Sequence, residues 1–267
     1  MKNYFENKVV WVTGASSGIG EACVYELSKQ HAKLILTALE EDILQQVKEK
    51  CLQLGAQKVT VLAANLSQLN TLALLAEEAW NCFGTIDLLF NNAGISQRAN
   101  TIDTDFEVIE KIMEVNYFAP VILTKAILPR MIERGGGQIA VTTSISGKFG
   151  FPLRSAYCSS KHALYGFFET VAAEYFKDNI HVTIVCPGRV QTNISLYALE
   201  KDGKPHGTLD PGQAKGITAE QAAKKIVRAF ERRKSEIFVG KEELLMVYIK
   251  RFFPKLCRKL TRRIKAM

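Results

Sequence analysis

The sequence predicts an α/β fold of the doubly wound kind, with one parallel sheet and helices on both of its faces. The first observation behind this prediction is that short apolar, β-branched runs alternate with amphipathic helical stretches along most of the chain. Strands joined by helices through right-handed crossovers run parallel, and the helices then cover both faces. The second is a glycine-rich turn directly after the first apolar run. The third is that 267 residues of 47% hydrophobic content, without a linker or a repeat, suit one domain.

Seven apolar runs are expected to form the strands, and the stretches between them the helices. The first run, KVVWVT, is apolar almost throughout, as expected of a strand that is buried on both faces. The strands are expected at 8–13, 33–38, 58–62, 86–90, 138–142, 181–186 and 236–239. Early helices are expected at 20–29, 41–53 and 71–80. A later helix should begin at Thr218, because Gln221 completes a capping box.

The turn after the first strand reads TGASSGIG and has the spacing G-x-x-x-G-x-G. Glycines at this turn let the backbone come close to a pyrophosphate, and the next helix offers free N–H groups and the positive end of its dipole. The simpler alternative is a glycine-rich turn that only reverses the chain. The position between a strand and a helix favours a dinucleotide site. The residues expected to bind the cofactor here are Gly14, Ser16, Ser17, Gly18, Ile19 and Gly20.

Further polar residues follow the fourth and fifth strands, at the edge where such sheets bind ligands. The turn NNAG after the fourth strand would face the cofactor, although asparagine-rich turns are also common without any ligand. Ser144 lies just past the fifth strand. Tyr157 and Lys161 are four residues apart and would share one face of a helix, which is a weak signal by itself. The cofactor residues expected in the NNAG turn are Asn92, Ala93 and Gly94.

These motifs, in this order and at these separations, resemble the short-chain dehydrogenase/reductase family. TGASSGIG, NNAG, and Ser144 followed by YCSSK carry the resemblance, which extends over nearly the whole chain to about residue 239. It implies a seven-stranded parallel Rossmann sheet, a nicotinamide cofactor, and assembly as a homodimer or homotetramer. It also implies that Asn116 is the family's catalytic asparagine and that the segment 187–192 meets the nicotinamide. The residues expected to do so are Pro187, Gly188, Val190 and Thr192.

The resemblance and the chemistry give an expected reaction, which is hydride transfer between the cofactor and a hydroxyl or carbonyl group of a lipophilic small molecule. Tyr157 would transfer the proton, helped by the Lys161 ammonium and the charge of the oxidised nicotinamide, which lower a phenol pKa of about 10. Ser144 would donate a hydrogen bond to the substrate oxygen, and Asn116 would hold a water that links Lys161 to solvent. The alternative is a redox sensor that binds cofactor without turnover, for which all four side chains would be unnecessary.

The end of the second strand favours NADP over NAD, with NAD as the alternative. A carboxylate at this position would bind the ribose hydroxyls and select NAD, but the position holds Ala38. Leu39 and Ser17 occupy the places where a basic residue would hold a 2′-phosphate, and Glu40 is a displaced partner for the ribose. Two residues after the third strand are expected beside the adenine: Asn65 and Leu66.

Two segments after the sixth strand are expected to have special roles. Residues 193–216 are rich in glycine and proline and too long for an ordinary connection, so we expect a mobile lid over the substrate. Residues 1–240 would form the catalytic domain, and 241–267 a basic amphipathic tail, kinked at Pro254. One apolar stripe of the tail comprises Leu245, Ile249, Phe252, Leu256, Leu260 and Ile264. The stripe either packs on protein or docks on an anionic membrane, as the similarity to membrane-associated members of the family also suggests.

Composition limits the remaining possibilities. The net charge of +8 comes from eight basic residues at 244–267, a stretch without Asp or Glu, so no general nucleic-acid surface is indicated. Six scattered cysteines without C-x-x-C spacing favour reduced thiols and no metal site. The polar residues 1–8 lack the apolar core of a secretory signal, so we expect a cytoplasmic protein. Among residues near the YCSSK motif, His162, Cys158 and Cys186 are expected to be structural.

Overall fold

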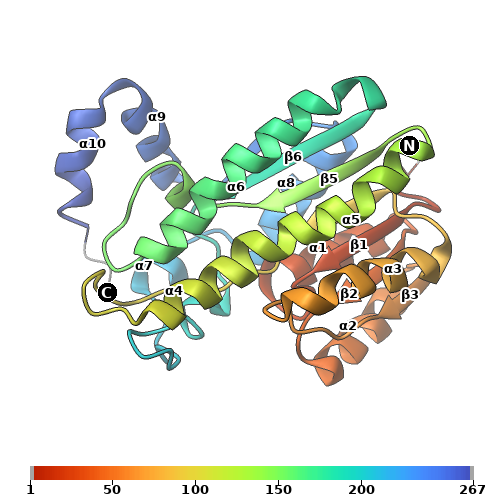
Figure 1. The fold of residues 1–267 in the computed structure, drawn as a ribbon, viewed down its shortest axis with the longest axis horizontal. Helices are drawn as coiled ribbons and strands as arrows, with labels where there is room; N and C mark the ends of the chain where they lie inside the picture. The colour runs from red at the N-terminus through yellow and green to blue at the C-terminus, as the bar shows by residue number, and fades with distance from the viewer. Residues whose placement is uncertain (1–2, 265–267) are drawn as a thin grey trace.

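The computed structural model describes residues 3–264 and contains one sheet of seven parallel strands (Figure 1). All seven expected strands are present, and only their ends differ slightly from the expectation. The strands are β1 (Val9–Thr13), β2 (Lys33–Thr37), β3 (Lys58–Val61), β4 (Leu88–Asn91), β5 (Gly137–Thr142), β6 (Ile180–Pro187) and β7 (Glu236–Val239). Their order in the sheet is β3-β2-β1-β4-β5-β6-β7, so the direction of winding reverses between β1 and β4. Ligands bind outside the carboxyl ends of the strands at such a reversal.

Helices cover both faces of the sheet, which confirms the doubly wound fold class. The main helices are α1 (Gly18–Ser28), α2 (Glu41–Gln53), α3 (Leu72–Phe83), α4 (Phe106–Met113), α5 (Ala119–Glu133), α6 (Ser155–Glu174), α7 (Pro211–Ala214), α8 (Ala219–Glu231), α9 (Leu245–Phe252) and α10 (Pro254–Thr261). The helices α1, α2 and α8 pack on one face, and α3, α5 and α6 on the other. The capping box expected at Thr218 and Gln221 opens α8.

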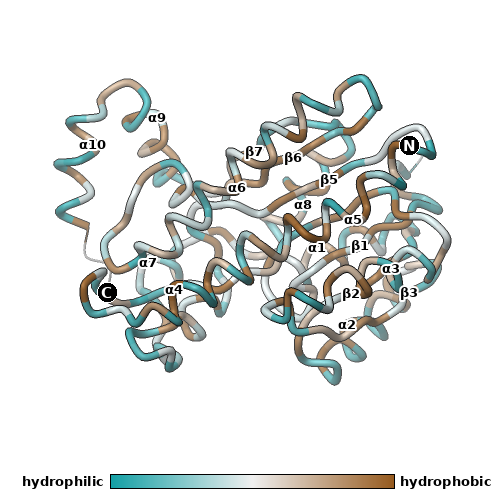
Figure 2. The backbone as a smooth tube through the Cα atoms, viewed as in Figure 1, coloured by the Kyte–Doolittle hydropathy of each residue, from teal (hydrophilic) through white to brown (hydrophobic). Residues whose placement is uncertain are grey.

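Alternate side chains of β1 enter two separate cores. Val10 and Val12 belong to the core beneath α1, α2 and α8, whereas Val9 and Trp11 belong to the core on the opposite face. Every residue of β1 is buried, as expected of a central parallel strand, and the strands are correspondingly apolar in Figure 2. The indole of Trp11 donates a hydrogen bond of 2.9 Å to Thr37 Oγ1, so its polar atom is satisfied inside the core.

A continuous helical segment, Phe106–Glu133, contains α4, a five-residue π-helix at Glu114–Phe118, and α5. By length and composition alone it could cross a membrane. In this fold it is a core helix, because Leu123, Ile127 and Met131 of α5 are buried against the sheet with α3. The π-helix carries Asn116, and single π-turns of this kind are frequent at functional sites.

The C-terminal helices α9 and α10 project at the end of the molecule opposite α2 and β3 (Figure 1). Pro254 separates them, as expected from its sequence position. One side of the pair packs on the body, where Met246, Ile249 and Cys257 join an apolar cluster that includes Phe149. The expected stripe is therefore divided, since Ile249 packs inward while most of the other described members face outward. The exposed large apolar residues of the pair are Leu245, Tyr248, Phe252, Phe253 and Leu256. Lys265 of the basic set lies outside the described residues.

Candidate active site

A cavity of about 500 Å³ lies at the carboxyl ends of the strands, where the winding reverses. Nearly all residues expected to bind the cofactor line it, together with three of the four expected catalytic residues. These lining residues are Gly14, Ser16, Ser17, Gly18, Ile19, Ala38, Asn65, Leu66, Asn92, Ala93, Gly94, Ser144, Tyr157, Lys161, Pro187, Gly188, Val190 and Thr192. Two expected site residues, Gly20 and Asn116, do not line the cavity.

The glycine-rich turn brings β1, α1 and the NNAG turn into close contact. Gly14 has a φ of +64°, and a Cβ there would lie 2.8 Å from Ala93 Cα. A Cβ on Gly20 would lie 2.0 Å from the carbonyl oxygen of Gly14, so Gly20 serves helix packing rather than ligand contact. No side chain caps the N-terminus of α1 at Ser17. The first-turn N–H groups therefore remain available to an anion at the cavity, which suits a pyrophosphate.

The NNAG turn is held against β1 by side-chain hydrogen bonds. Thr13 Oγ1 accepts from the backbone N–H groups of Asn92 at 3.1 Å and Ala93 at 3.2 Å. Asn92 Nδ2 donates to the carbonyl oxygens of Thr13 and Gly14, both at 3.2 Å, and Asn92 Oδ1 accepts from Thr142 Oγ1 at 3.0 Å. Asn92 thus joins the ends of β1, β4 and β5. The Asn92 amide therefore holds the strand ends together at the cavity wall.

Ser144, Tyr157 and Lys161 meet on one wall of this cavity. Ser144 follows β5, and its hydroxyl accepts a 3.1 Å hydrogen bond from Ser146 N, which fixes the side chain at the start of a short 3₁₀ turn. Tyr157 and Lys161 occupy the same face of α6, with Lys161 Nζ 5.7 Å from the centroid of the Tyr157 ring. Lys161 Nζ also donates a 2.8 Å hydrogen bond to the carbonyl of Thr142. All three side chains are buried.

Asn116 lies directly behind this group. A Cβ placed on Gly94 would lie 3.2 Å from both Asn116 Oδ1 and Lys161 Nζ, so the three residues converge. Asn116 Nδ2 donates to Ile95 O at 2.9 Å and Ser160 Oγ at 3.0 Å, while its Oδ1 accepts from Ile95 N at 2.8 Å. Asn116 belongs to the π-helix, so this part of the long helical segment lies beside Gly94 and Lys161.

Burial dominates the electrostatics of the two titratable groups. It raises the pKa of Tyr157, against the lowering effects of the Ser144 hydroxyl and of Arg154. It also lowers the pKa of Lys161 to about 7. Burial therefore leaves the phenol less acidic than the sequence suggests, and it also weakens the lysine charge that was expected to help.

Several residues of the site were not expected from the sequence. Gln97 and Arg98 extend the NNAG turn, Arg154 precedes α6, and Asp210 precedes α7; hydrogen bonds join all four around the start of α6. No local motif marks them, because they come from three segments that only the fold brings together. Among the residues expected to be structural, His162 is exposed, with Nδ1 2.8 Å from Cys158 O, and both Cys158 and Cys186 are buried.

Comparison with known proteins agrees with this arrangement. The family model for short chain dehydrogenase matches residues 8–202. The chain belongs to this family. It is 39% identical over 259 residues to the mouse (Mus musculus) protein named dehydrogenase/reductase SDR family member 7B, covering 96% of this chain and 80% of the relative. The chain is therefore an oxidoreductase of the short-chain dehydrogenase/reductase kind.

Two solved structures have the same fold. A short-chain dehydrogenase/reductase from Burkholderia phymatum, in complex with NAD, aligns with a TM-score of 0.83 at 23% identity, covering 95% of this chain and 96% of that one. An alcohol dehydrogenase from the archaeon Thermococcus sibiricus, complexed with 5-hydroxy-NADP, aligns with a TM-score of 0.75 at 25% identity, covering 89% and 97%.

Proposed function

We propose that this short-chain dehydrogenase transfers a hydride between a nicotinamide cofactor and a hydroxyl/carbonyl pair of a lipophilic small molecule. The observation that carries the proposal is the convergence of Ser144, Tyr157 and Lys161 on the wall of the cavity that also contains the glycine-rich turn. Apolar side chains from the segment 193–216 complete the cavity at Ile194, Tyr197 and Leu199. They favour a substrate with a hydrophobic body around its reacting oxygen.

The bound cofactor supplies the hydride or accepts it, and the chain supplies the proton transfer and orientation. Tyr157 donates a proton to the substrate oxygen during reduction and removes it during oxidation. Ser144 donates a hydrogen bond to the same oxygen and stabilises the charge that develops there. Lys161 lies beside the phenol, with Asn116 behind it, and the two provide a route for the proton towards solvent.

The test of this function is Tyr157→Phe, which removes the hydroxyl and keeps the ring. We expect a loss of turnover of at least about 10²-fold, as is typical when a general acid is removed, with the thermal stability and the binding of cofactor retained. The measurement is the absorbance of the reduced nicotinamide with a panel of long-chain alcohols, aldehydes and ketones. Turnover at the wild-type rate in the variant would contradict the assignment. Cofactor binding by the wild type without turnover of any compound would favour the redox sensor.

Either NADP or NAD fits the requirements of the cavity, and we propose that Glu40 influences the choice. The absence of a carboxylate at Ala38 leaves room for a 2′-phosphate and supports NADP. Glu40 acts in the opposite sense, because it lines the cavity and accepts a hydrogen bond from Ser16 at 3.3 Å. Its charge would repel a phosphate placed beside it.

We propose that residues 193–216 act as a lid over the bound substrate. The segment follows the expected nicotinamide contact at Thr192, and Gln213 Nε2 donates a 2.8 Å hydrogen bond back to Thr192 Oγ1. A lid that closes over ligand should be cut more slowly by protease when cofactor and substrate are both bound. Equal rates of cleavage with and without ligand would exclude this role.

We also propose that α9 and α10 dock the protein on the cytoplasmic side of an anionic membrane. The argument is charge complementarity, since exposed apolar side chains of the pair stand among basic residues in a stretch without acidic ones. In this state lipophilic substrates could reach the cavity from the bilayer. Assembly as a homodimer or homotetramer stays a prediction from the family resemblance.

A further inference from the structure

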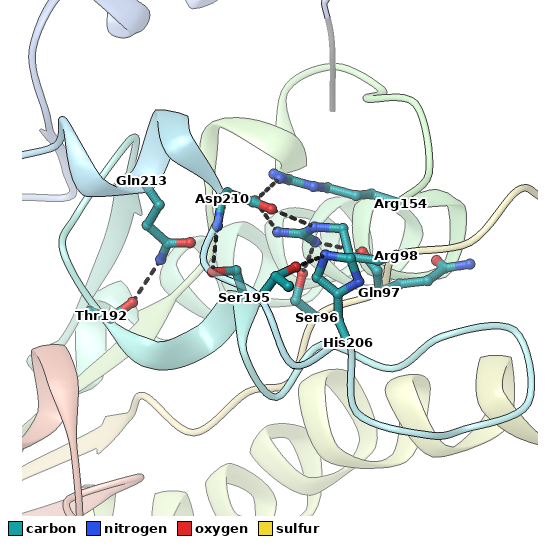
Figure 3. Close-up of polar contacts among 10 residues, drawn as sticks. Ser96, Gln97, Arg98, Arg154, Thr192, Ser195, His206, Asp210 and Gln213 are labelled. Atoms are coloured by element: carbon teal, nitrogen blue, oxygen red, sulfur yellow. Dashed lines mark hydrogen bonds and ion pairs between the residues drawn. The ribbon is translucent and has the colours of Figure 1, made fainter. Parts of the chain in front are cut away.

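Two arginines and one aspartate from three distant segments form a buried cluster beside the start of α6 (Figure 3). Asp210, in the segment 193–216, accepts hydrogen bonds from Arg98, which follows the NNAG turn, and from Arg154 Nη2 at 2.7 Å. The backbone N–H of Asp210 donates to Ser195 Oγ at 3.2 Å. The cluster therefore joins the proposed lid to the segment after the NNAG turn and to the start of α6.

The cluster contains two positive charges and one negative charge, so one positive charge is not neutralised within it. The side chains of Arg98 and Asp210 are only 2% and 10% exposed, and that of Arg154 is 21% exposed. Two guanidinium groups thus share one carboxylate in a largely water-excluded place. Burial and the charge of Arg98 lower the pKa of Arg154, whereas Asp210 raises it. An uncompensated buried charge lowers the stability of the fold, so its presence at this place points to a functional role.

The cluster lies at the start of the helix that carries Tyr157. Arg154 stands three residues before Tyr157, at the residue that precedes α6. Gln97, the neighbour of Arg98, accepts a 2.8 Å hydrogen bond from Ala156 N in the first turn of the same helix. The backbone N–H of Arg98 donates to Leu199 O at 2.8 Å, and the backbone N–H of Leu199 donates to Ser96 O at 2.8 Å. These two bonds also hold the proposed lid to the segment after the NNAG turn.

The groups around Tyr157 differ in the pH range over which they stay charged. Burial raises the pKa of Tyr157, and the Ser144 hydroxyl, Arg154 and Arg98 lower it, whereas Cys158 raises it. Burial lowers the pKa of Lys161 to about 7, so its positive charge is less firmly held than that of a solvated lysine. A guanidinium stays charged throughout the range in which proteins are stable. The arginines are thus the lasting source of positive potential at the phenol.

We infer that Arg98 and Arg154 are positioning residues for the proposed reaction, and that their excess positive charge, balanced by Asp210 on the closed lid, stabilises the phenolate form of Tyr157. The inference rests on the proposed function, since it assigns the charge to the proposed acid/base. It also links lid closure to the acidity of the site, because Asp210 belongs to the lid. Neutralising one arginine should make the phenol harder to ionise, and neutralising Asp210 should make it easier.

The test follows the ionisation of Tyr157 directly, through the ultraviolet band of the phenolate in NAD-saturated protein, with Tyr157→Phe subtracted as the blank. Arg154→Gln should move the midpoint to higher pH, and Arg154→Lys, which keeps the charge, should restore it. Asp210→Asn should move the midpoint to lower pH. Arg134→Gln is the matched control, because Arg134 forms its ion pair with Asp87 outside the cavity lining. Circular dichroism over the same pH range identifies any variant that has unfolded.

Opposite shifts in Arg154→Gln and Asp210→Asn support the inference, because a purely structural role would move both midpoints in the same direction. Unchanged midpoints in both variants, or shifts of the same sign, would overturn it. If Arg154→Gln does not fold, the direction of the shift in Asp210→Asn decides alone. The pH profile of alcohol oxidation should move by the same amount as the midpoint. Absence of turnover with an intact titration shift would instead count against the proposed function.

Discussion

The side chain of Asn116 forms hydrogen bonds with both backbone polar groups of Ile95: Oδ1 accepts from Ile95 N at 2.8 Å, and Nδ2 donates to Ile95 O at 2.9 Å. Asn116 is fully buried, and its third bond goes to Ser160. The asparagine therefore fixes the chain just after the NNAG turn to the π-helix and to α6. This arrangement makes its structural contribution separable from any part in proton transfer.

We predict that Asn116→Ala destabilises the fold by about 2–4 kcal/mol, because it leaves two partly buried backbone groups of Ile95 without partners. Urea denaturation measures this loss. Asn100→Ala is the control, since Asn100 is exposed and bonds only to nearby residues, and it should change stability by less than about 0.5 kcal/mol. If Asn116→Ala lost turnover with unchanged stability, the bonds to Ile95 would be unimportant for the fold.

A second prediction concerns the buried Lys161, whose pKa of about 7 lies below the value near 10.4 that a lysine has in an unfolded chain. Between these values the unfolded chain binds more protons, so the contribution of Lys161 to stability rises with pH. Below pH 7 the burial of the charged Lys161 side chain destabilises the fold to its full extent. This destabilisation disappears as the pH approaches 10. The maximal slope from one such group is about 1.4 kcal/mol per pH unit.

We therefore expect the free energy of unfolding of Lys161→Met to exceed that of the wild type most below pH 7. The difference should shrink as the pH is raised to 10. The measurement is the free energy of unfolding in urea at each pH. Lys125→Met, at an exposed position of α5, should run parallel to wild type. A constant difference between Lys161→Met and wild type across this range would show that the lysine is charged in the folded protein throughout.

The parts of the molecule that the sequence predicts are those with a local cause. The strands are apolar on both faces, the glycines of TGASSGIG are needed for close backbone contact, and Thr218 with Gln221 forms a cap within one turn. Each of these signals is complete within a few neighbouring residues. The cavity lining follows from them because parallel strands end at the same edge of the sheet.

The cluster around Asp210 lacked any such signal. Arg98, Arg154 and Asp210 are charged residues in loops, and nothing local distinguishes them from solvated surface residues. Their burial depends on the pairing of Leu199 with the chain after the NNAG turn, which is a tertiary contact. For the same reason the sequence predicts one apolar face for the tail, whereas packing against the cluster that contains Phe149 turns Ile249 inward.

The third prediction tests the cofactor end of the cavity. Glu40 and Ser16 are 3.3 Å apart at the cavity wall, and a lysine in place of Glu40 would attract a 2′-phosphate instead of repelling it. We expect Glu40→Lys to increase the ratio of NADP to NAD affinity by about tenfold or more, corresponding to roughly 1.4 kcal/mol. Calorimetric titration with both cofactors gives the ratio. Glu41→Lys makes the same change of charge one residue away, outside the cavity lining, and should alter the ratio far less. Equal ratios in both variants would leave Glu40 without a role in cofactor choice.

The last prediction concerns the exposed face of α9 and α10. Phe252 and Phe253 are 66% and 63% exposed at the junction of the two helices, and they are followed by basic residues such as Arg258 and Lys259. A truncation at residue 241 would remove this face, but it would also uncover the apolar residues on which α9 packs. Substitutions confined to the exposed side are therefore a sharper test of the membrane.

Vesicle co-sedimentation should pellet the wild type with vesicles rich in phosphatidylserine at low salt, and much less with phosphatidylcholine alone or at high salt. The double variant Phe252→Ser/Phe253→Ser should lose most of this binding through the loss of apolar contact. Arg258→Gln/Lys259→Gln should weaken it by about 2 kcal/mol, because each basic residue near the surface contributes about 1 kcal/mol. Phe176→Ser changes an exposed aromatic residue outside the tail and should bind like the wild type. Equal sedimentation of all four proteins would contradict membrane docking. If the phenylalanine variant instead changed the oligomeric state in sedimentation velocity, the face would be an interface between copies of this chain.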